Sequence, residues 1–172
     1  MKATANKAIC LMALLVLLVS ACGYRLEGGG HLHPGVARVG VTVFENRSAQ
    51  TYAGVYFTNE MIREIQDRTD TQVVDPDRAV FLVKGAIRGI TFSTLSRSST
   101  ETVTERRITA VVDVQLLDAD NAVLWSVSNF TATESYVVAP DKVNDEANIR
   151  EGVEIIAQRA AERIVSQMAA NF

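Results

Sequence analysis

The residues of this chain best suited to bind a ligand are basic side chains around one polar segment. They border or lie near the Ser/Thr-rich segment 93–104 and comprise Arg97, Arg106, Arg107, Lys84 and Arg88. An arginine guanidinium can hold a phosphate or a carboxylate with two parallel hydrogen bonds, which a lysine cannot do. If folding brings these basic side chains close together, they would suit an anionic ligand such as a phosphorylated lipid head group. A solvated strand end with scattered surface charge is the alternative, and the residues alone leave both open.

Patterns for catalysis or metal binding are weak. His31 and His33 have the spacing that places two rings on one side of an extended chain, but no third ligand stands near them. Segment 118–121 begins like a calcium loop, yet it lacks the glycine and the acid that such loops need, so a hairpin turn is favoured. No nucleophile motif or phosphate-binding glycine loop is present. The sequence predicts no enzyme, metal site or cofactor, although a carboxylate pair formed only by folding stays open.

The N-terminus indicates a different chemistry, the attachment of lipid. Lys2 and Lys7 precede the apolar run 8–19, and small residues follow, which is the pattern of a secretory signal. As a helix the 12-residue run would span about 18 Å, less than the ~30 Å of a bilayer core. Val19-Ser20-Ala21-Cys22 resembles the bacterial lipobox, whose cysteine sulfur takes a diacylglycerol and becomes the mature N-terminus. An ordinary signal peptide with an incidental cysteine is the alternative.

We therefore divide the chain into a signal peptide (1–21), a lipidated tether (22–35) and a single domain (36–172). Acyl chains anchor a protein without a spanning helix, although stable anchoring needs more than one chain. In the lipoproteins that this chain resembles, an aspartate after the cysteine favours the inner membrane. Gly23 stands there, so the resemblance implies the periplasmic face of the outer membrane. About a dozen extended residues reach at most ~45 Å, which keeps the domain near that membrane.

Charge and cysteine content limit the class of protein. The chain has 17 basic and 20 acidic residues, and removal of the signal would leave 15 basic and 20 acidic ones, a formal charge of −5. Proteins that bind nucleic acid are normally basic, so no nucleic-acid partner is expected. Cys10 would leave with the signal, so the mature chain could form no internal disulfide or thiolate zinc cluster. The remaining 151 residues suit one domain stabilised by burial.

Hydrophobic periodicity predicts the elements of this domain. The strands are expected at 36–45, 71–74 (a short candidate), 79–92, 106–117 and 122–136, and the helices at 52–68 and 142–170. Segment 93–104 is too polar for a core strand and predicts a protruding hairpin end. Each helix has one apolar stripe that needs a sheet to cover. We predict an α+β fold, with two helices packed on one face of a four-stranded mixed sheet in the order β-α-β-β-β-α.

Within each element, certain residues are expected to share a face. In the strands they are Val39, Val41 and Val43; Ile108, Ala110, Val112, Val114 and Leu116; and Val123, Trp125 and Val127. In the helices they are Val55, Thr58, Met61, Ile62 and Ile65; and Ile149, Val153, Ile156, Ala160, Ile164 and Met168.

The ordered set of motifs resembles the LptE family, the outer-membrane lipoproteins of lipopolysaccharide assembly. It comprises the lipobox, Cys22-Gly23-Tyr24-Arg25-Leu26, a Val-rich strand ending in Phe44-Glu45-Asn46, the polar hairpin, and Asn144-Asp145-Glu146 at the start of the last helix. The resemblance implies a lipoprotein that plugs and assembles the LptD β-barrel translocon and helps to place lipopolysaccharide in the outer leaflet. It implies that Arg97 and Lys142 lie where the family contacts lipopolysaccharide, with Arg106 and Arg107 as further candidates.

A second class of function stays open. Phe44-Glu45-Asn46-Arg47 after a Val-rich strand also resembles small periplasmic lipoproteins that activate peptidoglycan synthases or act as pilots of secretion pores. The short tether disfavours the first, because a synthase activator must reach an inner-membrane enzyme. A pilot of another outer-membrane complex remains the alternative.

Overall fold

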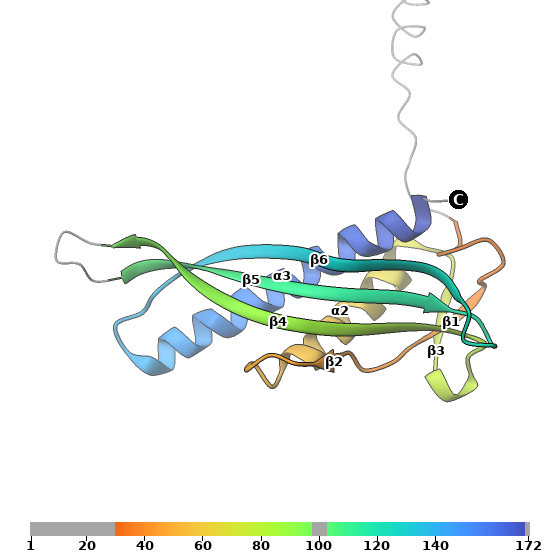
Figure 1. Cartoon of the computed structure of the whole chain (residues 1–172), viewed down its shortest axis with the longest axis horizontal. Coiled ribbons are helices and arrows are strands. Elements are labelled where there is room, and N and C mark those ends of the chain that lie inside the picture. The colour runs from red at the N-terminus through yellow and green to blue at the C-terminus, as the bar shows by residue number, and fades with distance from the viewer. Residues whose placement is uncertain (1–29, 98–102, 171–172) are drawn as a thin grey trace, which may run out of the picture.

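Two helices and six strands make up the part of the chain that the computed structural model describes, residues 30–97 and 103–170 (Figure 1). In chain order they are β1 (Arg38–Val41), β2 (Glu45–Asn46), α2 (Ala53–Arg68), β3 (Gln72–Val74), the 3-10 turn η1 (Pro76–Arg78), β4 (Phe81–Arg97), β5 (Val103–Leu117), β6 (Val123–Val137) and α3 (Lys142–Ala170). The predicted helices are both present, and α3 has the predicted bounds. The predicted signal peptide and Cys22 lie outside the described residues.

The strands form one mixed sheet in the order β3-β1-β4-β5-β6, and β2 also pairs with β4. The pairs of β1 with β3 and β4 are parallel, as is that of β2 with β4, whereas β4, β5 and β6 form an antiparallel meander. The α+β fold and the mixed sheet are confirmed. The prediction of four strands is wrong, because β3 joins the sheet and the predicted strand 36–45 is divided into β1 and β2.

A bulge causes this division. Val41 pairs with Val83, and Glu45 pairs with Ala86. The segment that joins β1 to β2 therefore has one residue more than the part of β4 opposite it. The extra residue reverses the predicted facing: Val43 is 71% exposed, and Phe44 is buried. The N–H group of Phe44 donates to Thr58 Oγ1 of α2 at 3.0 Å. The bulge thus turns an aromatic ring into the core and ties the sheet to α2.

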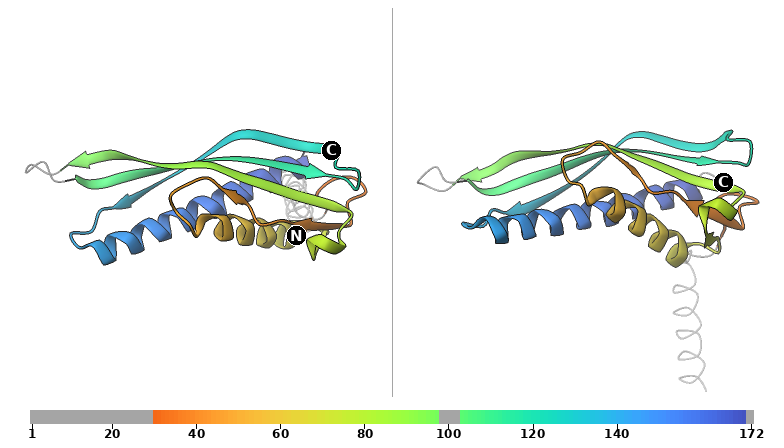
Figure 2. Two further views of the ribbon diagram at one scale, coloured as in Figure 1. Left: turned by 60° about the horizontal axis from the view of Figure 1, so that its bottom comes forward. Right: turned by 90° about the horizontal axis from the view of Figure 1, so that it is seen from below.

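Both helices lie on one face of the sheet, as predicted (Figure 2). The five β5 residues expected to share a face are all fully buried, and so is the α3 stripe from Val153 to Met168. The α2 stripe is partly wrong. Val55 is 53% exposed, whereas Phe57, which the prediction missed, is buried with Met61 and Ile65. The buried face of α2 is therefore turned toward α3 and the Phe44 ring, which meets Phe57 at 6.2 Å between centroids.

At the start of β6 a second register shift corrects another prediction. Trp125 pairs with Leu116 and Val123 with Leu117, so two residues of β6 oppose one of β5. The shift places Val123 on the opposite face from Trp125, and Val123 is 53% exposed. Trp125 is only half-buried, because β6 is an edge strand with no neighbour beyond it.

The interface between α2 and α3 contains a buried acid. Glu64 is 7% exposed, and its Oε1 lies 3.0 Å from Nε of Arg68. Burial raises the pKa of the Glu64 carboxyl; Arg68 opposes this shift, and Glu162 of α3 adds to it. The periodicity of α2 gave no sign of this acid, because it occupies a position of the apolar stripe.

We expect the domain to lose stability as the pH rises through the folded-state pKa of Glu64. An acid whose pKa is raised by folding binds more protons in the native state, so its stabilising contribution is complete below its unfolded pKa and is lost above its folded pKa. Urea unfolding from about pH 4 to about pH 8 should show this loss. Glu64→Gln should flatten the profile, and Asp67→Asn, at an exposed α2 position, should not. An unchanged slope in Glu64→Gln would contradict the expectation.

The end of the predicted tether packs on the domain. Leu32 and Val36 are fully buried. Thr71, which is 2% exposed, accepts a hydrogen bond from Leu32 N and donates one to Val36 O, both at 2.8 Å. The N–H group of Asp70 also donates to Gly30 O at 3.0 Å. Segment 30–36 is therefore held against the loop between α2 and β3.

The β4–β5 hairpin lies at the other end of the molecule from this segment and from the end of α3 (Figure 1). The segment 93–104, expected to be a protruding hairpin end, is paired as far as Arg97 and Val103, and residues 98–102 lie outside the described part. The two strands of the hairpin stay extended as far as these residues, because the serine and threonine side chains of this segment are compatible with strands.

Candidate functional site

The four basic residues predicted to bind a ligand lie toward the end of the molecule that carries the tip of the β4–β5 hairpin. We call this end, which is opposite segment 30–36, the distal end (Figure 1). Arg97 is the last residue of β4 and is exposed, and Lys142 is the exposed first residue of α3. Arg106 is partly buried on β5, and Arg107 beside it is exposed. Within residues 30–97 and 103–170, none of the four makes an ion pair. Their charges are thus available to an anion.

The sheet separates Arg106 from Arg107, because successive strand residues point to opposite faces. Arg106 pairs with Thr94 and Tyr136. Arg106, Ile108 and Ala110 are alternate residues of β5, so Arg106 points to the same face as the other two, the face that the helices cover. Arg107 pairs with Ser93 and Ser135 on the open face. The predicted cluster is therefore two basic positions on opposite sides of one strand.

Two other basic residues do not belong to this site. Lys84 pairs with Gln115, which is eight residues from Arg107 along β5, or roughly 27 Å. Arg88 stands at a bulge of β4 and forms an ion pair with Asp113 at 3.3 Å. Asp113 also accepts from the N–H group of Asn129 at 2.7 Å. The charge of Arg88 is therefore compensated.

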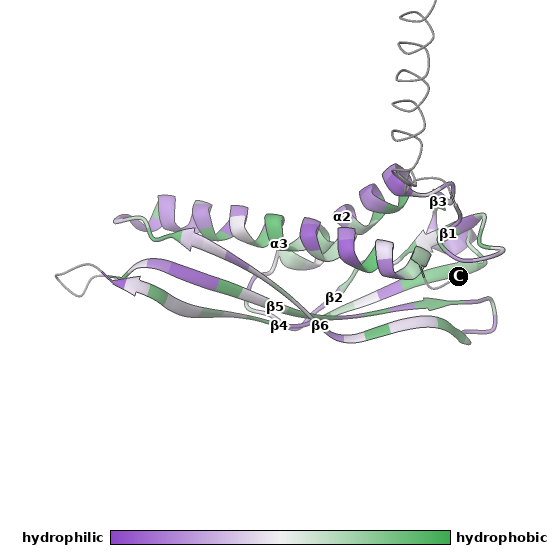
Figure 3. Ribbon diagram, turned by 90° about the horizontal axis from the view of Figure 1, so that it is seen from above, coloured by the Kyte–Doolittle hydropathy of each residue, from purple (hydrophilic) through white to green (hydrophobic). Residues whose placement is uncertain are grey.

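Hydroxyl groups are frequent on the open face of the sheet toward the hairpin end. Thr91, Thr109 and Thr133 are paired in one row across β4, β5 and β6, and Ser93, Arg107 and Ser135 form the next row toward the hairpin end. Figure 3 shows hydrophilic residues along the distal parts of β4 and β5 and on the first turns of α3. A face of this kind suits a hydrated, polar partner surface. The alternation of Thr131, Thr133 and Ser135 with Ala132 and Tyr136 was the sequence signal for it.

The first turn of α3 is fixed by Asp141. Its Oδ1 accepts from Asn144 N at 2.9 Å, and its Oδ2 accepts from Asn144 Nδ2 at 2.7 Å. These hydrogen bonds from Asn144 lower the pKa of the Asp141 carboxyl. The same turn is tied to the end of β6, where Asp145 Oδ1 accepts from Ala139 N at 3.1 Å. Lys142 thus has a defined position next to the end of β6.

An open hollow of about 710 Å³ runs along the first turns of α3. Its lining residues are Lys142, Val143, Glu146, Ala147, Arg150, Glu151 and Glu154. Arg150 also lies over the ring of Tyr52, 4.8 Å from its centroid, and burial raises the pKa of that phenol. Three acids face two bases here, so the hollow as a whole does not favour an anion.

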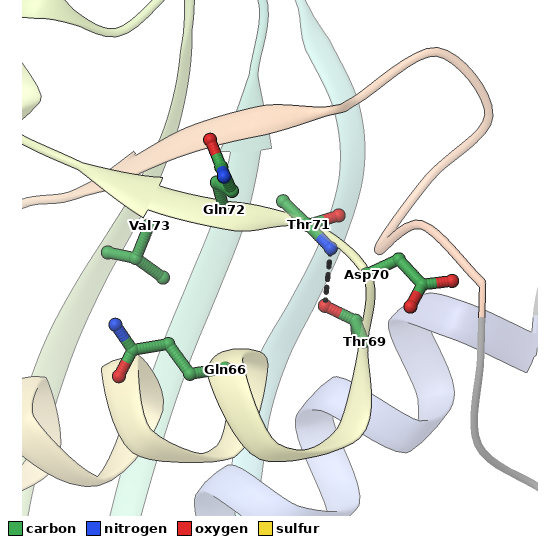
Figure 4. Close-up of a pocket in the computed structure, with 6 residues that line it drawn as sticks. All are labelled: Gln66, Thr69, Asp70, Thr71, Gln72 and Val73. Carbon is green, nitrogen blue, oxygen red and sulfur yellow. Dashed lines mark hydrogen bonds between the residues drawn. The ribbon is translucent and has the colours of Figure 1, made fainter.

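A second, smaller hollow of about 340 Å³ lies at the opposite end, between α2 and β3 (Figure 4). Gln66 and Val73 approach it from the helix and the strand, and Thr71 N donates to Thr69 Oγ1 at 3.2 Å beside it. Asp70 is its one ionisable residue. It adjoins the place where segment 30–36 joins the domain and has no cationic group for an anionic ligand.

The weak metal patterns of the sequence do not come together in the described part. No three His, Cys, Asp or Glu side chains of residues 30–97 and 103–170 lie close enough to hold a metal ion. Asp118 Oδ1 accepts from the N–H groups of Asp120 and Ala122, both at 2.9 Å, and Asn121 adopts a positive φ of 60°. Segment 118–121 is therefore a hairpin turn. None of the described helices is long and apolar enough to cross a membrane.

Three solved structures of bacterial lipoproteins share this fold. A putative lipoprotein from Caulobacter crescentus CB15 matches with a TM-score of 0.59 at 18% identity, over 81% of this chain and 93% of its own. Uncharacterized lipoprotein B from Nitrosomonas europaea matches with a TM-score of 0.57 at 23% identity, over 87% and 92%. Rare lipoprotein B from Shewanella oneidensis matches with a TM-score of 0.52 at 16% identity, over 78% and 95%. The fold is thus one that bacterial lipoproteins use.

The LptE family model, described as lipopolysaccharide-assembly, matches residues 36–168. The chain belongs to this family, and the resemblance noted in its sequence is confirmed. The protein is therefore a member of a family of non-enzymatic lipoproteins of lipopolysaccharide assembly. No curated protein matches the chain significantly.

Proposed function

We propose that this protein is an outer-membrane lipoprotein, anchored through Cys22 on the periplasmic face, that plugs and assembles an LptD-type β-barrel translocon. In this role it helps to place lipopolysaccharide in the outer leaflet. The observation that carries the proposal is the LptE family match over residues 36–168. The lipobox pattern before Cys22 supports the anchor.

The shape and charge of the domain are consistent with this role. The open face of the sheet is rich in hydroxyl groups, which suits the polar lumen of a membrane barrel. Arg97, Arg106 and Lys142 lie at the distal end without ion pairs among the described residues, where they could contact the phosphates of lipopolysaccharide. Arg107 belongs instead to the hydroxyl-rich open face.

The packed segment 30–36 shortens the free tether. Seven residues, 23–29, separate Cys22 from Gly30, so the eight Cα–Cα steps between them reach at most about 29 Å. The hairpin end lies on the other side of the molecule (Figure 1). A lipid on Cys22 would keep the end with segment 30–36 beside the membrane, while the hairpin end projects from it.

Co-purification of the native complex tests the proposed partner. We expect mass spectrometry to find acylated Cys22 at the mature N-terminus, and detergent extraction of outer membranes to retain a β-barrel of the LptD type with the protein. A Cys22→Ala variant should lose the acyl chains and its place in the membrane fraction. Recovery of a secretin or of a peptidoglycan synthase in place of the barrel would favour the alternative function and overturn this one.

We expect charge reversal at Arg97 and Arg106 together to weaken lipopolysaccharide binding while leaving the fold intact. Arg97 is exposed and Arg106 is partly buried, and neither forms an ion pair within the described part of the chain whose loss would unfold the domain. Surface plasmon resonance with immobilised protein would measure binding, and circular dichroism would check folding. Equal binding by a folded double variant would show that these charges are only surface.

A further inference from the structure

Tyr136 carries a buried hydroxyl group that the fold does not use. The residue is 6% exposed, and its Oη has no hydrogen-bond partner in the described part of the chain. A buried hydroxyl without a partner is destabilising, so it calls for an explanation such as a bound group. The family resemblance of the sequence did not single out this tyrosine.

The hydroxyl belongs to one row of side chains across three strands. Tyr136 of β6 pairs with Arg106 of β5, which pairs with Thr94 of β4. Residues paired in this way have Cβ atoms about 4.5–5.5 Å apart on one face of the sheet. The Tyr136 ring meets the ring of Phe92 on β4 edge-on, at 6.4 Å between centroids, so the two rings lean toward each other over β5. The phenol therefore lies on the same face as the Arg106 side chain.

This row stands where the covered face of the sheet opens to solvent. Ile108 is fully buried, and a Cβ on Gly152 of α3 would lie 2.6 Å from its Cδ1, so helix and sheet are in close contact there. One row nearer the hairpin end, Arg106 is partly exposed and Thr94 is exposed, as is Thr104 beyond them. A ligand could thus reach Arg106 from the hairpin end while the Tyr136 hydroxyl stays shielded from water.

We propose that Arg106, Tyr136 and Thr94 form a subsite for a phosphoryl group on the helix-covered side of the sheet. The guanidinium supplies charge and paired N–H donors, and the two hydroxyls supply one donor each. Glu134 pairs with Ile108 in the neighbouring row of the same face. Its carboxylate forms an ion pair with Arg159 of α3, so it does not neutralise the charge of Arg106. A phosphoryl group, free or on a lipid, has oxygens enough for all three side chains. A lipid source for it rests on the proposed function.

The open face is the weaker candidate for the same ligand. Arg107 lies there between Ser93 and Ser135, and all three side chains are exposed to water. Water can satisfy all of their donors, so none of these three side chains is a counterpart of the shielded Tyr136 hydroxyl. Arg107 and Arg106 therefore form a matched pair: adjacent residues on one strand, with the same charge and opposite faces.

Binding assays on four proteins test the subsite: wild type, Tyr136→Phe, Arg106→Gln and Arg107→Gln. The probes are lipopolysaccharide, enzymatically dephosphorylated lipopolysaccharide and inorganic phosphate. We expect the first two variants to bind lipopolysaccharide at least about tenfold more weakly, as for the loss of a hydrogen bond to a charged group, and Arg107→Gln to bind normally. Removal of the phosphates should weaken wild-type binding by a similar factor. Tyr136→Phe should keep or raise the unfolding midpoint, because it removes an unpaired buried hydroxyl.

The outcomes separate the subsite from the proposed function. Wild-type affinity in Tyr136→Phe, or equal losses in Arg106→Gln and Arg107→Gln, would overturn the subsite while lipopolysaccharide binding by the wild type stands. In a further outcome, the wild type binds inorganic phosphate, with an affinity that Tyr136→Phe reduces, and shows no binding of lipopolysaccharide. In that case the subsite holds for free phosphate, and the proposed contact with a lipid is wrong. If the wild type binds neither probe, both are overturned.

Discussion

Replacing Gly85 by alanine is expected to destabilise the domain by about 3–5 kcal/mol, the range for loss of a buried phenylalanine side chain. The ring of Phe44 occupies the space above Gly85. A Cβ placed there would overlap three ring carbons, Cε1, Cζ and Cδ1. Phe44 is 2% exposed and its N–H group is held by Thr58, so the ring cannot move without leaving the core. The added methyl group therefore acts as if it removed the ring.

A double-mutant cycle with Phe44→Ala tests this cause. Without the ring the alanine at position 85 has room, so the second substitution should add little to the first, and the two effects should be strongly non-additive. Gly89→Ala, in the same strand, is the matched control, because a Cβ there would meet nothing within 4 Å. Urea unfolding of the four variants measures the effect. A full Gly85→Ala penalty in the Phe44→Ala background would contradict the explanation.

Thr71→Val is expected to cost roughly 2–4 kcal/mol, the second largest effect. Valine keeps the volume of threonine but removes both hydrogen bonds of the hydroxyl, leaving the N–H group of Leu32 and the carbonyl of Val36 buried and unpaired. Each unpaired buried group costs about 1–3 kcal/mol. Segment 30–36 should then open more readily, and the Leu32 amide should exchange with deuterium faster than in the wild type.

Thr91→Val is the control for this substitution, since Thr91 is an exposed residue of β4 with no hydrogen bond to the N-terminal segment. It should leave both stability and Leu32 exchange close to the wild type. Hydrogen exchange followed by mass spectrometry would distinguish local opening of segment 30–36 from global unfolding. Unchanged protection of Leu32 in Thr71→Val would show that apolar burial alone holds the segment.

The two ends of the molecule thus have different tasks in the proposed function. One end carries segment 30–36 and the short remaining tether, and the other carries basic residues that form no ion pair within the described part of the chain. The 17 residues of β4 extend over roughly 56 Å, so the hairpin end is far from the domain's attachment point. If the hydrogen bonds of Thr71 to Leu32 and Val36 were lost, segment 30–36 could detach and lengthen the tether by up to six residues, without changing the ligand-binding end.

Local patterns in the sequence determined much of the fold. The bounds of α3, its buried stripe, the buried face of β5, the covering of one sheet face by both helices and the family itself were all predicted from periodicity and motif order. These features depend on a residue's near neighbours along the chain, because the period of a helix or strand sets which side chains share a face.

Only the tertiary structure decided the remaining features. Single-residue bulges exposed Val43 and buried Phe44, and they turned Val123 away from Trp125. Cross-strand register placed Tyr136 beside Arg106 on the covered face. The physical reason is that a shift of one residue moves every following side chain to the other face of a strand, and pairing between distant segments sets that shift. The residues of the predicted ligand site could therefore be named from the sequence, but their grouping could not.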